Sequence, residues 1–360
     1  MKRLIVVVAF ACACLPAARS RAQNPEPMDI RACTAIESDA QRLACYDRAT
    51  GRANLPAADK RSDRSTAPNI LDHRAQSEAT TASAEDAAKP ASLLDSRWEL
   101  SPESKLGTFN VRGYQPVYVM PVFATSNQNK QPTSPNPLNT VNTPQQLDNV
   151  EAKFQLSLKT KVVQGVFGDV GDLWVGYTQS SRWQVYNEAN SRPFRETDYE
   201  PEALLVFNTH YNVFGWDGRM LAIGLDHQSN GRADPLSRSW NRVVANIGFE
   251  RDGWTVMLRP WWRIPEDSKD DNNPDISNYV GRGEVQIIHE WRGQEFGLMM
   301  RDSFRGGSNQ HGAGRLTWSF PLVGNLRGYA EFFKGYGESL IDYNHNATYF
   351  GLGVSLLDWY

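Results

Sequence analysis

Short segments in which apolar side chains alternate with polar ones recur along this chain from about residue 110 to its end. In residues 153–159, Phe154, Leu156 and Leu158 alternate with lysine, glutamine and serine. Successive side chains of a strand point to opposite faces, so each segment has one apolar face and one polar or charged face. Such a chain folds into β-sheet, either as a soluble sandwich or as a barrel that places its apolar face in lipid.

Twelve segments of this kind begin near residues 112, 150, 171, 200, 217, 239, 253, 280, 294, 311, 325 and 346. Short polar turns, such as 251–253, alternate with long polar connections, such as 124–148. Short turns at one rim and long loops at the other are typical of outer-membrane barrels, and aromatic residues such as Trp254 fit the interface girdle. We therefore predict an all-β chain, with a twelve-stranded antiparallel transmembrane β-barrel over residues 110–360. An even strand count places both ends of the barrel in the periplasm.

The net charge of −3 gives no basic field for nucleic acid, and we predict no nucleic-acid partner. The mean hydropathy of −0.53 does not exclude a membrane barrel, because lipid-facing and lumen-facing residues alternate and average out.

Residues 1–22 have the features of a signal peptide: a positive start, an apolar run from Leu4 to Leu15, and a cleavage site at 20–22. An alternative is a lipoprotein signal at Cys12, although the residues before Cys12 match such a signal poorly. Export to an oxidising compartment is the expectation in either case.

Residues 23–50 form a small segment that contains Cys33 and Cys45, the two cysteines left after removal of the signal. Outside the cytosol a disulfide between them is expected, and two free buried thiols are the alternative. Residues 51–109 begin with a stretch rich in Ala, Asp, Ser, Arg and Lys, which buries too little apolar surface to order itself. We predict a flexible linker and hence a mostly disordered periplasmic extension.

Polar residues extend two apolar stripes where the fifth and sixth strands meet. Period-two alternation continues the face of Leu225 into His227 and Ser229, and it places Asn241 on one face of the next strand. Roughly 7 Å separates the Cα atoms of residues two apart on a strand, which lets an imidazole reach a hydroxyl. The three residues match a base, a nucleophile and an orienting amide. The alternative is that they are rim residues without chemistry. The Gly-x-Ser-x-Gly elbow of α/β-hydrolases is absent.

The connection between these strands offers oxygen ligands. Asp234, Ser237 and several carbonyl groups are the hard ligands that calcium prefers. Carboxylates are too few for a tight site, so backbone oxygens, waters or a second chain would have to complete it.

The segment HQSNGRADPLSRSWNR resembles the signature of the outer membrane phospholipase A family of Gram-negative bacteria. The similarity extends over the barrel, at FQLSLK (154–159), YTQ (177–179), PFRETDYEP (193–201), DDNNPDI (270–276) and GYGESLIDYN (335–344). It implies a calcium-dependent phospholipase A1/A2 of twelve strands that hydrolyses acyl esters of phospholipids and lysophospholipids and is active as a homodimer in the outer membrane.

The resemblance also implies roles for particular residues. Ser229 would be the nucleophile, His227 the general base and Asn241 the residue that orients it. Calcium would be held by the carbonyl of Arg232, the hydroxyl of Ser237 and the carbonyl of a partner subunit's serine matching Ser191 in this chain.

Further positions match the family less directly. Asp234 matches an acid near the site, and Asp271 is the candidate for a second acid in a stretch where this chain has extra residues. Gln179 matches a polar residue of the lipid-facing dimer surface. Gln228 stands where the family commonly has an acid, and we expect its side chain to point inward, with little effect.

Two other functions stay open at this stage. A passive porin would work through its lumen and tolerate changes at His227 and Ser229. An envelope tether would depend on residues 23–109 and use the barrel as an anchor. His210 and His289 have no serine or acid at a useful spacing and are expected to have structural roles. His345 follows Asp342-Tyr343-Asn344 near the last strand and is expected to be a rim residue.

Overall fold

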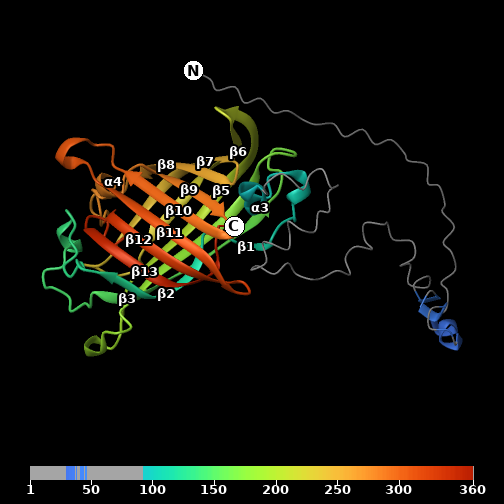
Figure 1. Cartoon of the computed structure of the whole chain (residues 1–360), viewed down its shortest axis with the longest axis horizontal. Helices are drawn as coiled ribbons and strands as arrows, with labels where there is room; N and C mark the ends of the chain where they lie inside the picture. The colour runs from blue at the N-terminus through green and yellow to red at the C-terminus, as the bar shows by residue number, and fades with distance from the viewer. Residues whose placement is uncertain (1–29, 37, 39–40, 44, 47–91, 360) are drawn as a thin grey trace, which may run out of the picture. The chain divides into compact units, whose positions relative to one another are not determined.

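Consecutive antiparallel pairing closes the strands into a ring in the computed structural model of this chain (Figure 1). The strands are β1 Val111–Gly113, β2 Val117–Thr125, β3 Val150–Val163, β4 Asp172–Trp183, β5 Phe194–Val213, β6 Trp216–Ser229, β7 Ser239–Arg251, β8 Trp254–Ile264, β9 Gly283–Trp291, β10 Gln294–Asp302, β11 Gly312–Val323, β12 Leu326–Tyr336 and β13 Asn346–Leu357. The last strand, β13, pairs with β2, and β1 pairs with the end of β3 beyond its contact with β2. Because β1 continues the line of β2, the ring has twelve members, which confirms the predicted barrel.

The structure describes residues 30–36, 38, 41–43, 45–46 and 92–359. The predicted signal peptide and most of the predicted linker lie outside these residues. Short helices connect or precede the strands: η1 Ile30–Ala35, α3 Leu93–Trp98, η4 Pro102–Ser104, η5 Pro137–Asn139, η6 Glu188–Asn190, α4 Ile276–Tyr279 and η7 Gly307–Asn309. No helix in the described part of the chain is long and apolar enough to cross a lipid bilayer.

The two rims of the barrel differ in the length of their connections. At the rim where β2 begins and β13 ends, two-residue turns join four strand pairs, at 214–215, 252–253, 292–293 and 324–325. The opposite rim carries the long connections 126–149, 184–193, 230–238, 265–282, 303–311 and 337–345. The connection between β6 and β7 therefore lies at the rim opposite the ends of the barrel.

Side chains alternate between an apolar exterior and a charged interior. Along β3, Leu156 is 45% exposed on the outside, whereas Lys153 is 2% exposed inside. The Lys153 ammonium pairs with Glu331 at 2.7 Å, and Arg195 pairs with Glu151 at 2.8 Å. Buried charges need such partners, so the lumen is held by a network of ion pairs while the outer face suits lipid.

Helix α3 packs into the rim where the barrel begins and ends (Figure 1). Its Arg97 is buried and donates hydrogen bonds to the carbonyls of Tyr114, Asp358 and Trp359 at 2.7 to 2.9 Å. Trp98 packs edge-on against Trp174 inside the barrel. The linker was predicted to reach residue 109, and this boundary is wrong, because the chain from Ser92 onward is anchored by these contacts.

The amino-terminal segment contains a pair of cysteines. Its Cys33 and Cys45 form a disulfide with 5.6 Å between their Cα atoms, as expected for an exported chain. Arg42 donates a hydrogen bond to the carbonyl of Ile36 within the same segment.

Candidate active site

The outer face of the β6–β7 pair carries the three residues singled out by the sequence. Register places His227 opposite Asn241 and Ser229 opposite Ser239. Leu225, on the same face as His227, is 58% exposed, so this face is the lipid-facing exterior. Gln228 lies between His227 and Ser229 and points inward, as its parity predicted. It accepts a hydrogen bond from the Trp240 indole at 2.8 Å. The site therefore lies on the outside of the wall, near the rim that bears the long connections.

His227 and Asn241 are joined directly. Nδ1 of His227 lies 2.8 Å from Oδ1 of Asn241. An amide oxygen only accepts hydrogen bonds, so Nδ1 carries the proton and Nε2 is left with a free lone pair. The Ser229 hydroxyl, two residues along the same face, makes no hydrogen bond within the described residues. This arrangement suits a base and a nucleophile that meet when substrate binds, since such contacts are often long in its absence.

A carboxylate contacts Asn241 on the side away from His227. The Asn241 amide nitrogen donates to Oε1 of Glu266 at 2.9 Å. Glu266 follows β8 in the connection to β9, and sequence reasoning did not identify it. One signal was available: Ile264 pairs with Asn241, and Glu266 lies two residues further on.

The β6–β7 connection is rigidly held by its own arginine. Arg238 is fully buried and donates to the carbonyls of Ser237, Asn139 and Thr133 at 2.7, 2.8 and 3.2 Å. Burial lowers the pKa of this guanidinium from its ordinary value. Asn230 closes the base of the connection through its amide, which donates to the carbonyl of Leu236 at 2.8 Å. The backbone oxygens of this loop thus have fixed positions.

Oxygen atoms of the same loop fit a hard cation. Ser237 Oγ accepts from the Asn272 amide at 2.9 Å, and Oδ1 of Asp234 accepts from Asn139 at 2.7 Å. Each of these oxygens keeps a further lone pair, and the backbone carbonyl of Arg232 belongs to the same connection. A hydroxyl, a carbonyl and a nearby carboxylate are the donor set that calcium takes.

Two other candidate ligands lie on different connections. Asp271 is buried, and its Oδ1 accepts from Arg263 at 2.7 Å, so in this chain its charge is paired with an arginine. Its neighbour Asn272 contacts Ser237 and reaches the loop directly. Ser191 lies in the β4–β5 connection in a left-handed conformation, with φ of 57°.

Comparison with known proteins identifies the family. The family model described as phospholipase A1 matches residues 94–356. The chain belongs to the phospholipase A1 family. It is 36% identical over 348 residues to a Neisseria meningitidis serogroup B protein that carries the phospholipase A1 name, covering 91% of this chain and 90% of that protein. This membership confirms the resemblance, and it makes the chain a phospholipid ester hydrolase.

Solved structures of relatives have the same fold. The crystal structure of the Salmonella typhi outer membrane phospholipase dimer with bound calcium is 37% identical, with a TM-score of 0.63 over 70% of this chain and 94% of that chain. An asparagine-to-alanine active-site mutant of the Escherichia coli outer membrane phospholipase A is 34% identical, with a TM-score of 0.62 over 71% and 95% of the two chains.

Gln179 of this phospholipase lies on the lipid-facing side of β4. Its Oε1 accepts from the Tyr177 hydroxyl at 3.2 Å, and its Nε2 lies 3.4 Å from Ser181 Oγ. These contacts leave hydrogen-bonding capacity on an apolar face.

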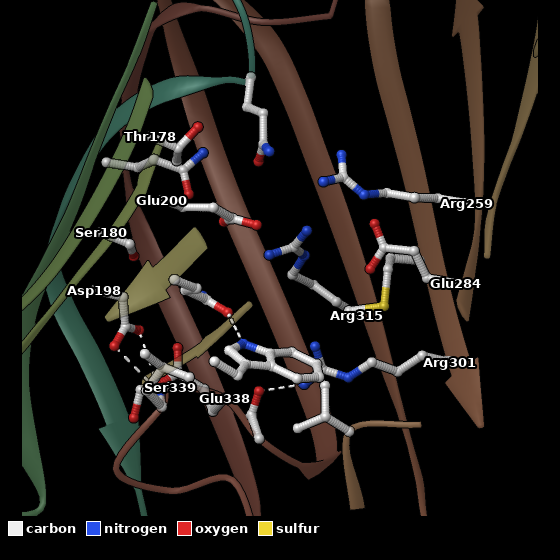
Figure 2. A pocket seen from close by; sticks show the side chains of 18 of the residues that line it. Thr178, Ser180, Asp198, Glu200, Arg259, Glu284, Arg301, Arg315, Glu338 and Ser339 are labelled. Atoms are coloured by element: carbon white, nitrogen blue, oxygen red, sulfur yellow. Dashed lines mark hydrogen bonds between the residues drawn. The ribbon is translucent and has the colours of Figure 1, made fainter. Parts of the chain in front are cut away.

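The lumen of the phospholipase holds a cavity of about 140 Å³ lined by charged side chains. Figure 2 shows Asp198 and Glu200 on one wall and Arg259 and Arg301 pointing toward them from the other. Arg259 pairs with Asp226 at 2.7 Å. Ion pairs cross the lumen and helix α3 packs into one rim, which disfavours the passive porin considered from the sequence.

His289 and His345 have structural contacts. His289 stacks on Trp254 with ring centroids 3.9 Å apart, and Nε2 of His345 lies 2.8 Å from the carbonyl of Asn127. His210 lies on β5, at the end remote from the site. None of the three contacts Ser229 or Asn241 in the part of the chain that the structure describes.

Proposed function

We propose that this enzyme hydrolyses acyl esters of phospholipids and lysophospholipids with Ser229 as nucleophile, His227 as general base and Asn241 as its orienting residue. The observation that carries the proposal is the 2.8 Å contact between His227 Nδ1 and Asn241 Oδ1 on the lipid-facing wall. An active-site asparagine in the Escherichia coli relative supports it.

In the proposed reaction, His227 transfers a proton in each step. His227 Nε2 takes the proton of Ser229 Oγ as that oxygen bonds to the ester carbonyl carbon. The imidazolium then gives the proton to the departing glycerol oxygen as its bond to the acyl carbon breaks. Water then attacks the acyl-serine as His227 takes its proton, and the imidazolium returns a proton to Ser229 Oγ as the acyl–oxygen bond breaks and the fatty acid leaves. Throughout, Asn241 keeps Nδ1 protonated and the ring in place.

Calcium is proposed as the cofactor. Arg232 would offer its carbonyl and Ser237 its hydroxyl, with Asp234 and Asp271 nearby and the carbonyl of the partner subunit's Ser191 completing the set. When bound, the ion would stabilise the negative charge that develops on the ester carbonyl oxygen. The Salmonella typhi relative, a dimer with bound calcium, supports both the ion and a homodimeric active form.

The proposed location is the outer membrane, with both ends of the barrel in the periplasm. Short turns at the rim of the chain ends and long connections at the opposite rim support this orientation. The site would then face the outer leaflet, so turnover would require phospholipid there.

Covalent trapping tests the nucleophile. The purified barrel in detergent is treated with a long-chain fluorophosphonate, which reacts with activated serines, and the adduct is located by peptide mass spectrometry. We expect labelling of Ser229 that is lost in His227→Ala. Labelling of another serine at an equal rate, or unchanged labelling in His227→Ala, would contradict the assignment.

A further inference from the structure

Glu266 lies beside the catalytic row, meaning the proposed catalytic residues Ser229, His227 and Asn241, without contacting the reacting atoms. It follows Ile264, the residue opposite Asn241, by two positions and is partly exposed at the outer rim. Its Oε1 accepts from the Asn241 amide nitrogen at 2.9 Å. The row thus continues from imidazole to amide to carboxylate across β6, β7 and the end of β8.

An asparagine alone cannot decide which way its amide points. Exchanging its oxygen and nitrogen would present an N–H donor to His227, stabilise the tautomer with the proton on Nε2, and remove the base. A carboxylate only accepts hydrogen bonds. With Glu266 on one side, the amide nitrogen must face the carboxylate, and Oδ1 must face His227.

Glu266 also carries the charge that the amide lacks. An amide orients an imidazole but does not neutralise the imidazolium that forms during the reaction. The nearby cations are engaged elsewhere: Arg263 pairs with Asp271, and Arg242 pairs with Asp226 on the inner face. In the described residues no lysine or arginine lies within ion-pair distance of Glu266. Its negative charge is therefore available to the row.

We propose that Glu266 is a positioning residue of this enzyme, which fixes the Asn241 amide and through it the reactive tautomer of His227. The proposal rests on the proposed function, because it assigns Glu266 a part in the same reaction.

The test is a double-mutant cycle between positions 241 and 266, read as kcat and KM for phospholipid in mixed micelles with saturating calcium. Glu266→Gln keeps the size of the side chain but removes the charge and allows the amide to turn. We expect kcat to fall about tenfold with KM unchanged, the scale of one charged hydrogen bond. Asp267→Asn is the matched control: Asp267 is exposed one residue further on, and asparagine can still accept from the Lys269 amide. It should leave kcat unchanged.

The second arm of the cycle measures Glu266→Gln in the Asn241→Asp background, where its effect on kcat should change from a loss to a gain. In Asn241→Asp a carboxylate faces His227 directly, and Glu266 becomes a repelling neighbour. Adding Glu266→Gln to Asn241→Asp should therefore raise kcat, because glutamine can donate to the new carboxylate. A merely structural role in the loop would lower kcat in both backgrounds.

Three outcomes would overturn the proposal: an unchanged kcat in Glu266→Gln, an equal loss in both backgrounds, or no detectable activity in the double variant. Failure of the proposed function looks different, since it would show as retained activity in Ser229→Ala whatever residue stands at position 266.

Discussion

The imidazole of His227 and the amide of Asn241 are directly opposite each other across the β6–β7 pair, with 2.8 Å between Nδ1 and Oδ1. Strand register therefore brings the two side chains together on the same face of the wall. Side chains on paired strands are held more precisely than side chains on loops, which suits a site that must keep its shape next to mobile lipid.

Asn241→Ala should lower kcat by about 100-fold, the lower range of what a positioned general base contributes. Without the amide oxygen, the ring of His227 can rotate and take either tautomer. The measurement is fatty-acid release under saturating phospholipid and calcium, with folding checked by the far-UV spectrum. A kcat equal to that of the unaltered enzyme would remove Asn241 from the mechanism.

Ser237→Ala should raise the calcium concentration for half-maximal activity about tenfold, with activity at saturating calcium largely retained. The change removes one oxygen ligand and leaves the loop clamped by Arg238. A calcium titration of activity measures this effect. Ser268→Ala, an exposed serine of the β8–β9 connection, is the control. Identical titration curves for all three proteins would place the ion elsewhere.

Gln179→Leu should weaken the proposed homodimer by about tenfold in dissociation constant, because the substitution would remove one desolvated hydrogen bond from the predicted dimer surface. Sedimentation in detergent with calcium reports the dimer fraction. Thr348→Val removes a polar group from the lipid-facing side of β13 and should not change that fraction. Equal effects of the two substitutions would point to a different dimer surface.

Arg97→Met should lower the free energy of unfolding by about 2 to 4 kcal/mol, because it leaves several buried carbonyls without a donor. Urea unfolding in detergent measures the change. Arg251→Met, at an exposed turn of the same rim, should cost less than about 1 kcal/mol. Comparable losses in the two variants would show that helix α3 does not stabilise the barrel.

The alternation of apolar and polar side chains made most of the barrel strands predictable from the sequence. Lipid contact forces one face of every strand to be apolar, so the twelve predicted starts fall close to the observed ones. The largest error is β5, which begins at Phe194 rather than near residue 200. Its first residues include Arg195, Glu196 and Asp198, and such a run of charges resembles a loop unless their partners across the lumen are known.

Helix α3 and Glu266 could not be predicted, because both depend on contacts between residues far apart in the sequence or on different strands. Helix α3 is ordered by Arg97, whose acceptors lie at the far end of the chain. Glu266 was missed because it belongs to a polar connection and acquires a partner only through the pairing of β7 with β8. The shared face of His227, Ser229 and Asn241 could be predicted because their parity on the strands already placed them there.

Fatty-acid release from phospholipid in mixed micelles tests the central claim most directly. The assay compares the unaltered enzyme with Ser229→Ala, each with calcium and with a chelator, and uses Ser239→Ala, the serine opposite Ser229, as the control. We predict full activity for the control with calcium, none in chelator, and a loss of at least about 1,000-fold in Ser229→Ala. Activity that persists in Ser229→Ala, in a barrel that is otherwise folded, would contradict the account.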